Sequence, residues 1–411
     1  MDTPSPPPQR KVLVAGGGFA AVEALLALRA LLGERVELTL ISSGERLAFR
    51  PAATYEAFDS NGDPPNSCSL REITADAQAR FHHGRLESVS PAVHAVRLAS
   101  GASLRYDSLI LALGARARVA IPGALTFRDQ RDVPQMRALL EEVRRGAARR
   151  IVFAVPSGCA WPMPLYELAM FTAAYAEQAD VEVEVSLVSP AGAPLDIFGA
   201  QASARVQRLL MERGVRFRGG LVPAGVRYDG ALQLHFGGTV PADRVVAAPQ
   251  LRGPRIVGVP SRWWGFVPTD PEGRVEDLID VYAAGDMTSF PIKQGGLAAQ
   301  QADMIARVIA AQEGIDVAVP PPVDHGRMIE AQLLGGVQTL AMKARLDAHG
   351  AHDPSFGCAS ATPLRQTGSA QGKISGRYLR SYLAGRGIAA RRGLRAEKRG
   401  PAEDAHAANG V

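Results

Sequence analysis

A glycine-rich turn between an apolar strand and an apolar helix constrains this chain more than any other feature of its sequence. An apolar run at 12–15 leads into Gly16-Gly17-Gly18-Phe19-Ala20-Ala21, a helical apolar pattern continues to Leu32, and a second strand is expected at 36–41. The strand, the turn, the helix and the second strand lie within about thirty residues. A GxGxxA pattern indicates dinucleotide binding only in this context. The pattern predicts a parallel α/β unit that binds a dinucleotide.

Each small residue of the turn has an expected role in that binding. Gly16 makes the tight turn, Gly18 lets backbone N–H groups approach a pyrophosphate, and Ala21 allows close packing of helix on strand. Three successive glycines without a ligand would carry an entropic cost with nothing to offset it. The second strand ends in Ser42 and Ser43, where an acidic residue usually holds the ribose, so we expect serine hydroxyls to take that contact.

Two later segments resemble the flavin disulfide-reductase superfamily. The first is a buried strand at 106–113 that ends at Gly114, and the second is Val281-Tyr282-Ala283-Ala284-Gly285-Asp286. The resemblance implies FAD as cofactor and assigns Asp286 to the ribitol chain. A helix after Gly296 would point its positive end at the flavin, and Lys293 is the candidate for a cationic charge near the reduced ring.

The stretch Phe49-Arg50-Pro51 resembles the FxP segment beside the flavin in type II NADH dehydrogenases and sulfide:quinone oxidoreductases, and it narrows the resemblance to that branch. The residues predicted to contact FAD are Gly16, Gly18, Phe19, Ala20, Ala21, Ser42, Ser43, Arg50, Pro51, Ala112, Gly114, Gly285, Asp286, Lys293 and Gln294.

A second nucleotide fold is expected near 150–260, but its glycine motif is missing. After the strand at 150–155, the segment 156–169 contains three prolines, Trp161 and the single glycine Gly158. A pyrophosphate cannot approach such a backbone closely, and the next strand, at 181–188, ends without a carboxylate or arginine for the ribose. NAD(P)H binding in the usual mode is therefore disfavoured.

Three segments of this region resemble the sulfide:quinone oxidoreductases, namely 164–167, 187–190 and 249–254. In that family the second fold persists while its nucleotide site serves another purpose. The family uses a cysteine pair beside the flavin, which makes Cys159 and Cys358 the catalytic candidates with Lys293. Cys159 lies two residues before the family position, which Trp161 occupies. A packing role for Cys159 and a loop role for Cys358 are the alternatives.

The expected fold class is α/β, with two Rossmann-like, three-layer dinucleotide-binding domains of the glutathione reductase type and a small C-terminal interface domain. Each is expected to have a mostly parallel sheet. The predicted boundaries are 1–118 and 260–315 for the FAD-binding domain, 119–259 for the degenerate NAD(P)-like domain, 316–384 for the interface domain and 385–411 for a disordered basic tail. A proline-rich lead-in is expected before Lys11.

The C-terminal region suggests contacts outside the catalytic core. Residues 333–346 read as a hairpin, and 374–383 as an amphipathic helix whose tyrosines, leucines and arginines suit either the surface of an anionic membrane or packing on the core. Of these two alternatives, membrane contact would involve residues 374–399. The eight histidines lack metal-ligand spacing, and the basic tail carries no nucleic-acid motif, so neither a metal nor a nucleic acid is expected.

These features leave three functions open. The first is an enzyme that takes electrons from a small reductant, sulfide or a related sulfur species, and passes them through FAD to a quinone. The second is an NAD(P)H-dependent flavin dehydrogenase, and the third a flavin-binding sensor without efficient turnover. The three dispersed cysteines indicate a reducing, cytoplasmic setting. A location at the inner face of the cell membrane is the alternative.

Overall fold

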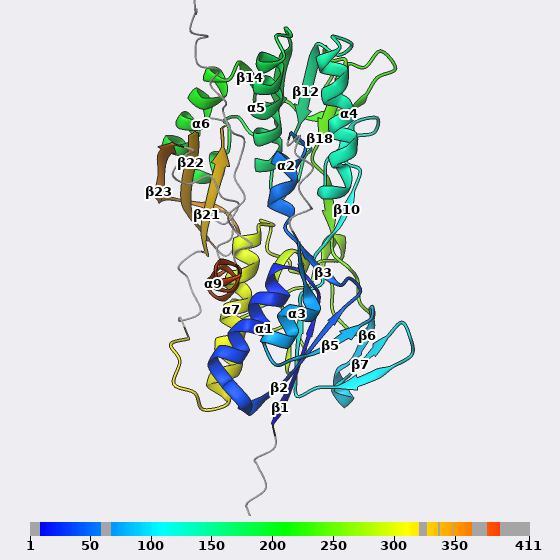
Figure 1. Cartoon of the computed structure of the whole chain (residues 1–411), viewed down its shortest axis with the longest axis vertical. Helices are drawn as coiled ribbons and strands as arrows, with labels where there is room; N and C mark the ends of the chain where they lie inside the picture. The colour runs from blue at the N-terminus through cyan, green and yellow to red at the C-terminus, as the bar shows by residue number, and fades with distance from the viewer. Residues whose placement is uncertain are drawn as a thin grey trace, which may run out of the picture.

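The computed structural model describes residues 9–58, 67–319, 327–335, 338–347, 349–363 and 376–386. Two α/β units lie one above the other along the long axis, and a smaller sheet lies at the side of their junction (Figure 1). This arrangement confirms the predicted fold class of two Rossmann-like units. The expected lead-in and all of the expected basic tail beyond residue 386 lie outside the described residues.

The first unit is a five-stranded parallel sheet built from two distant parts of the chain. Its strand order is β20-β9-β1-β2-β5. The strands are β1 (Arg10–Ala15), β2 (Val36–Ser42), β5 (Arg80–His83), β9 (Ser108–Leu111) and β20 (Val281–Ala283). Helices α1 (Phe19–Leu32), α3 (Leu70–Asp76) and α7 (Gly295–Gln312) lie together beside this sheet in Figure 1. Because β20 pairs with β9, the sheet is complete only when the chain returns from the second unit.

Short antiparallel strands complete the first unit. The strands β6 (Leu86–Ser90), β7 (Ala95–Leu98) and β8 (Ser103–Arg105) form a sheet whose apolar residues share a core with β1 and β9. A second, two-stranded pairing joins β3 (Arg46–Ala48) and β4 (Ser67–Ser69). The short helix α2 (Ala53–Glu56) contacts α5 (Met163–Gln178) of the second unit.

The second unit repeats the parallel arrangement. Its strand order is β11-β18-β12-β13-β14 and every neighbouring pair is parallel. The strands are β11 (Leu125–Thr126), β12 (Arg150–Ala154), β13 (Glu184–Val188), β14 (Val215–Arg218) and β18 (Arg244–Ala247). Its helices are α4 (Val133–Arg144), α5 (Met163–Gln178) and α6 (Ala200–Glu212), with the antiparallel strands β15 (Pro223–Val226), β16 (Leu232–Leu234) and β17 (Thr239–Val240).

The C-terminal sheet is antiparallel, so the expectation of a mostly parallel sheet there is wrong. The strands β21 (Arg327–Leu334), β22 (Gln338–Leu346) and β23 (His352–Pro363) pair in sequence order. Short links of this kind can join only antiparallel neighbours, because a parallel pair needs a long crossover. The pairing of β21 with β22 forms a hairpin, but this hairpin begins at Arg327, earlier than the predicted 333–346.

A buried carboxylate ties the two units and the C-terminal sheet together. Glu167 of α5 is 1% exposed, and its Oε2 accepts a hydrogen bond from the hydroxyl of Thr54 in α2 (2.9 Å). Its other oxygen, Oε1, accepts from the backbone N–H of Leu334 in β21 (3.2 Å). One side chain therefore fixes three parts of the chain against one another.

The C-terminal helix α9 (Arg377–Gly385) packs on the first unit. Leu379 and Leu383 are buried among the apolar residues of α1 and α7, and the Glu23 carboxylate accepts the N–H groups of Tyr378 (2.9 Å) and Leu379 (2.7 Å). The apolar stripe of this helix was expected either to contact a membrane or to pack on the core, and the structure shows packing on the core. The rest of the segment proposed for membrane contact, 387–399, lies outside the described residues.

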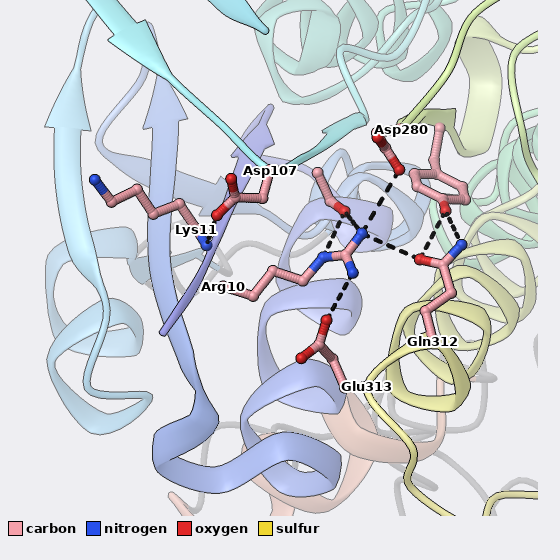
Figure 2. Close-up of polar contacts among 8 residues, drawn as sticks. Arg10, Lys11, Asp107, Asp280, Gln312 and Glu313 are labelled. Atoms are coloured by element: carbon pink, nitrogen blue, oxygen red, sulfur yellow. Dashed lines mark hydrogen bonds and ion pairs between the residues drawn. The ribbon is translucent and has the colours of Figure 1, made fainter. Parts of the chain in front are cut away.

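The first unit is fastened at the end of its sheet opposite the glycine turn, where strand β1 begins. Arg10 of β1 donates to the Ser108 hydroxyl from Nε (3.0 Å) and Nη2 (2.8 Å), and to Oε1 of Glu313 from Nη1 (2.6 Å) (Figure 2). Its Nη2 also reaches Gln312 (3.1 Å) and Asp280 (3.6 Å). The early strands are thus bound to the chain segment that arrives after the second unit.

Arg10→Met should destabilise the protein by about 1–3 kcal/mol, because charged hydrogen-bond partners with little exposure lose their donor. Thermal unfolding of the FAD-loaded protein measures the effect. Arg80→Met is the matched control, since Arg80 pairs with Glu37 (2.9 Å) while 77% exposed, and such surface pairs contribute at most about 1 kcal/mol. Equal shifts of the two melting temperatures would contradict the role given to Arg10.

Candidate active site

The starts of helices α1 and α7 meet at one point in the first unit. Gly285, just after β20, lies between them: a Cβ at this position would come within 3.4 Å of the Ala20 Cβ and 3.3 Å of the Ala298 Cβ. The Phe19 ring covers Gly295 so closely that a Cβ there would lie 2.7 Å away. Two helix N-termini with their positive dipole ends therefore converge, which favours anionic groups between them.

The glycine turn has the shape that a pyrophosphate requires. Gly16 has φ 141°, and a Cβ on it would lie 2.1 Å from the carbonyl oxygen of Ala112, so no other residue fits. Gly18, by contrast, faces open space, with nothing within 4 Å of the corresponding position. Helix α1 starts there without a side-chain cap and without an acidic residue in its first turn. Its first N–H groups are thus available to a phosphate oxygen.

Asp286 follows Gly285 and is the acidic group of this region. It is half-buried, and its side chain takes part in none of the hydrogen bonds or ion pairs found among the described residues. Burial raises the pKa of this carboxyl, while the charges of Arg50 and Lys293 act in the opposite direction. A carboxylate held without a protein donor is suited to accept hydrogen bonds from ligand hydroxyls, as the ribitol chain of FAD provides.

Gln301 of α7 fixes the backbone beside Asp286, and no feature of the sequence predicted this role. Its Oε1 accepts a hydrogen bond from the N–H of Gly285 at 2.6 Å, and its side chain is 7% exposed. In the sequence it is one of three glutamines in an alanine-rich helix, and nothing distinguishes it from the neighbouring Gln300. Its position is determined only by the packing of α7 on the strand end.

The two serines after β2 differ in their surroundings. Ser42 is buried, its hydroxyl accepts from the N–H of Gly44 (3.2 Å), and a Cβ on Gly17 would lie 2.5 Å from it. Ser43 is exposed, and its carbonyl oxygen is hydrogen-bonded to Nε2 of His83 (3.1 Å). The ribose contact predicted for the pair stays a prediction.

Helix α7 begins with a side-chain cap that leaves its first amides open. The side chain of Gln294 accepts from the N–H of Leu297 (2.8 Å) and donates to the carbonyl of Glu330 in β21 (3.1 Å). The cap therefore does not use the N–H groups of Gly295 and Gly296. Gln294 shapes the helix start while joining it to the C-terminal sheet.

Lys293 is buried just before that helix. Its Nζ donates to the carbonyls of Thr288 (2.5 Å) and Phe290 and lies 4.2 Å from the centre of the Phe266 ring. Burial lowers the pKa of Lys293 to about 8, although the nearby Asp286 acts to raise it. The predicted catalytic role stays a prediction, and with these contacts the amine can act on a ligand through its charge.

The turn that opens α5 in the second unit is closed by its own hydrogen bonds. The N–H of Cys159 donates to Pro156 (3.2 Å), and that of Leu165 donates to Pro162 (3.0 Å). Pro164 has no N–H, and the Trp161 ring packs edge-on against Phe198 at 6.1 Å between centroids. The three prolines of the turn have no N–H and two further amides are already bonded, so the turn offers a pyrophosphate fewer donors than a glycine-rich turn would, in keeping with the sequence prediction.

The same turn touches the flavin half of the site. The carbonyl oxygen of Ala160 accepts a hydrogen bond from the backbone N–H of Lys293 at 3.3 Å. Cys159 is half-buried against the core of the second unit, and burial raises the pKa of its thiol to about 11. Cys358 lies in β23 opposite Lys343, but its side chain falls outside the described residues.

The structure brings together most of the residues predicted to hold FAD. Ala21 is fully buried in α1, and Gly114 has φ 68° at the end of β9. Arg50 and Pro51 open a 3-10 turn whose preceding residue, Phe49, packs its ring 5.4 Å from that of Phe19. Phe19 therefore serves helix packing with its side chain, so a contact with FAD would fall to its backbone.

Comparison with known proteins agrees with this geometry. Residues 10–313 match the family described as pyridine nucleotide-disulphide oxidoreductase. The chain is 23% identical over 260 residues to a sulfide-quinone reductase from Aquifex aeolicus (strain VF5), covering 60% of each chain. It is 26% identical over 324 residues to the ferredoxin–NAD(+) reductase component of a biphenyl dioxygenase system from Paraburkholderia xenovorans (strain LB400), covering 76% of each.

A solved structure extends the likeness in fold to most of the chain. The sulfide:quinone oxidoreductase of Aquifex aeolicus superposes with a TM-score of 0.75 at 18% identity, covering 92% of this chain and 90% of that one. Among the described helices, none is both long and apolar enough to cross a membrane.

Gly16→Ala should abolish or severely weaken FAD binding, because its methyl group would overlap the Ala112 carbonyl and the left-handed backbone disfavours any side chain. The ratio of flavin to protein absorbance after purification measures the loss. Gly44→Ala is the control, since a Cβ there meets nothing within 4 Å. Full flavin content in Gly16→Ala would overturn the assignment of this turn.

Proposed function

The chain belongs to the pyridine nucleotide-disulphide oxidoreductase family and uses FAD, and from this premise we propose that it passes electrons from a small sulfur-containing reductant, sulfide or a related species, to a quinone. The observation that carries the proposal is the closed turn at the start of α5. Its prolines and internal hydrogen bonds reduce the amides available to a dinucleotide, while the carbonyl of Ala160, next to Cys159, contacts the backbone of Lys293 just before α7.

FAD, when bound, supplies a two-electron acceptor that a quinone can reoxidise. The residues expected to hold it are the turn from Gly16 to Gly18, Asp286 and the first amides of α7. Their shared task is to neutralise anionic groups of the cofactor with helix dipoles and to accept its hydroxyl protons. Arg50 and Lys293 add positive charge on the side of Asp286.

Cys159 is the residue proposed to receive the sulfur of the reductant. Its thiol has a raised pKa, so it is protonated at neutral pH and must lose that proton before it can act as a nucleophile. Joining the sulfur of HS⁻ to the Cys159 sulfur would form an S–S bond with loss of one proton, and the two electrons released would be accepted by FAD when it is bound. The positive charge of Lys293, whose backbone N–H donates to the carbonyl of Ala160 in this turn, favours an anionic reductant.

Oxidation of NAD(P)H is the second candidate, and the similarity to a ferredoxin–NAD(+) reductase component favours it. Gly158 has φ 68°, and a Cβ on it would meet nothing within 4 Å, so a nucleotide could approach the turn at this residue. Against it stand the internal hydrogen bonds of the turn and the place taken by Trp161 against Phe198. The sulfur-containing donor therefore remains the preferred assignment.

Cys159→Ser should abolish reduction of the bound FAD by sulfide under anaerobic conditions, because a hydroxyl cannot carry the transferred sulfur. Cys68→Ser is the matched control: Cys68 is also a free cysteine but is buried in β4, within the first unit. Rapid-mixing absorbance of the flavin band gives both rates. An unchanged rate in Cys159→Ser would refute its proposed role.

The Lys293 amine should give the flavin potential an additional pH dependence. Below about pH 8 the amine is charged and favours the electron-rich reduced flavin, and as the pH rises through this value the charge is lost and reduction becomes harder. Redox titration between mildly acidic and alkaline pH should show the step in the wild type. Lys293→Met should lack the step and stay at the lower potential that the wild type reaches only above this pH, whereas Lys293→Arg, always charged, should keep the higher potential. Three superimposable curves would remove Lys293 from the site.

A further inference from the structure

A two-stranded ribbon between the two units carries arginines in direct opposition. The strands β10 (Arg116–Arg118) and β19 (Gln250–Arg252) pair antiparallel, with Arg116 opposite Arg252. Because side chains alternate along a strand, Arg118 projects from the same face as Arg116. All three arginines are exposed.

Two tryptophans lie against this ribbon on the loop before Gly265. Trp263 is 86% exposed and Trp264 is 37% exposed, although indole rings are normally well covered. The guanidinium carbon of Arg252 lies 4.3 Å above the centre of the Trp264 ring, and the carbonyl of Trp264 accepts the N–H of Gly253 (2.9 Å).

Arg255 completes the same surface, because its Cγ would lie 2.7 Å from a Cβ on Gly265. We call Arg116, Arg118, Arg252, Arg255, Trp263 and Trp264 the Trp–Arg surface.

The charge of this surface has no counterpart within the described protein. None of its four arginine side chains takes part in an ion pair or hydrogen bond among the described residues. Arg262, next to Trp263, differs in being bound to Glu276 by two contacts of 2.6 and 2.8 Å. Like charges placed directly opposite each other across two strands are destabilising, so Arg116 and Arg252 need anions from outside.

We propose that the Trp–Arg surface binds the headgroup region of an anionic lipid bilayer. Tryptophan is enriched at the boundary between headgroups and acyl chains, where its apolar ring and its N–H are both accommodated. Arginine binds phosphate oxygens with a fork of donors and is less strongly hydrated than lysine. The surface has both components side by side, with the aromatic pair on a loop and the guanidinium groups beside it.

The small extent of the surface favours a bilayer over a protein partner. A stable protein interface buries about 800 Å² on each side and needs a complementary shape. Two rings and four guanidinium groups are too few for that, whereas lipids rearrange around a protruding loop. The apolar stripe of α9 is no competitor, since Leu379 and Leu383 are buried in the first unit. The inference goes beyond the proposed electron transfer and holds for any electron donor.

Vesicle flotation of the oxidised, FAD-loaded protein tests the proposal without any substrate. We expect binding to phosphatidylcholine vesicles that contain phosphatidylglycerol and little binding to phosphatidylcholine alone. Each replacement Arg116→Gln or Arg252→Gln should weaken the partition coefficient about fivefold, and raised salt should have the same direction of effect. Trp263→Ser combined with Trp264→Gly should reduce binding further, glycine being chosen for the φ of 64° at that position.

The matched control is another exposed pair of arginine and aromatic side chain. Tyr228 is 96% exposed with the Arg227 guanidinium 5.7 Å from its ring centre, but Arg227 also pairs with Asp229 (3.5 Å). Tyr228→Ser should leave vesicle binding unchanged. Equal binding by the wild type and by the double tryptophan variant would overturn the proposal and assign any membrane affinity to another segment.

Fluorescence locates the contact directly, because the chain has three tryptophans. Trp161→Phe leaves the pair at 263 and 264 as the only emitters, and anionic vesicles should shift this emission to the blue and let brominated acyl chains quench it. Emission that stays unshifted while the protein floats with vesicles would contradict insertion of the loop. Emission that responds to an acidic electron-transfer protein and not to vesicles would replace the lipid surface with a protein partner.

Discussion

The close approach of α1 and α7 is the contact on which the rest of this site depends. Only small residues permit it: Gly285 sits between Ala20 and Ala298, and Gly295 lies under the Phe19 ring. The approach sets two positive helix ends side by side and leaves Asp286 next to them without a protein partner. Because α1 and α7 come from chain segments separated by the whole second unit, the site exists only in the completed fold. The pairing of β20 with β9 and the contacts of Arg10 at the other end of the strands hold these distant segments together.

The second unit contributes position more than nucleotide chemistry. Glu167 ties α5 to α2 and to β21, while the carbonyl of Ala160 holds the backbone of Lys293. A turn that closes on itself with its own amides is poor for phosphate but rigid, and rigidity is what a side chain such as Cys159 needs beside a cofactor. The geometry supports the proposal that the nucleotide-like half of this fold positions the site and does not bind a nucleotide.

Most of the cofactor side could be predicted from the sequence, because its determinants are local. The glycine turn, Gly114 and Gly285-Asp286 follow strands and need particular backbone conformations that sequence order reveals. Gln301, the Glu167 contacts and the burial of α9 depend on which distant segments meet, and no periodicity records that. The expectation of a parallel C-terminal sheet was wrong because it extended the pattern of the two larger units to this region. The short links between its strands allow only antiparallel pairing. The exposed tryptophans at 263 and 264 carried no signal in the sequence, since an indole is usually covered.

The central claim, that a sulfur-containing donor rather than a nicotinamide nucleotide reduces the flavin, is tested most directly by anaerobic mixing of the wild-type protein with sulfide and, separately, with NADH. The visible absorption band of FAD reports reduction, and a soluble quinone added afterwards reports reoxidation. Rapid bleaching by sulfide, no bleaching by NADH and recovery with quinone are the predicted results. Rapid bleaching by NADH alone would contradict the account and show that the turn at Gly158 opens to a dinucleotide.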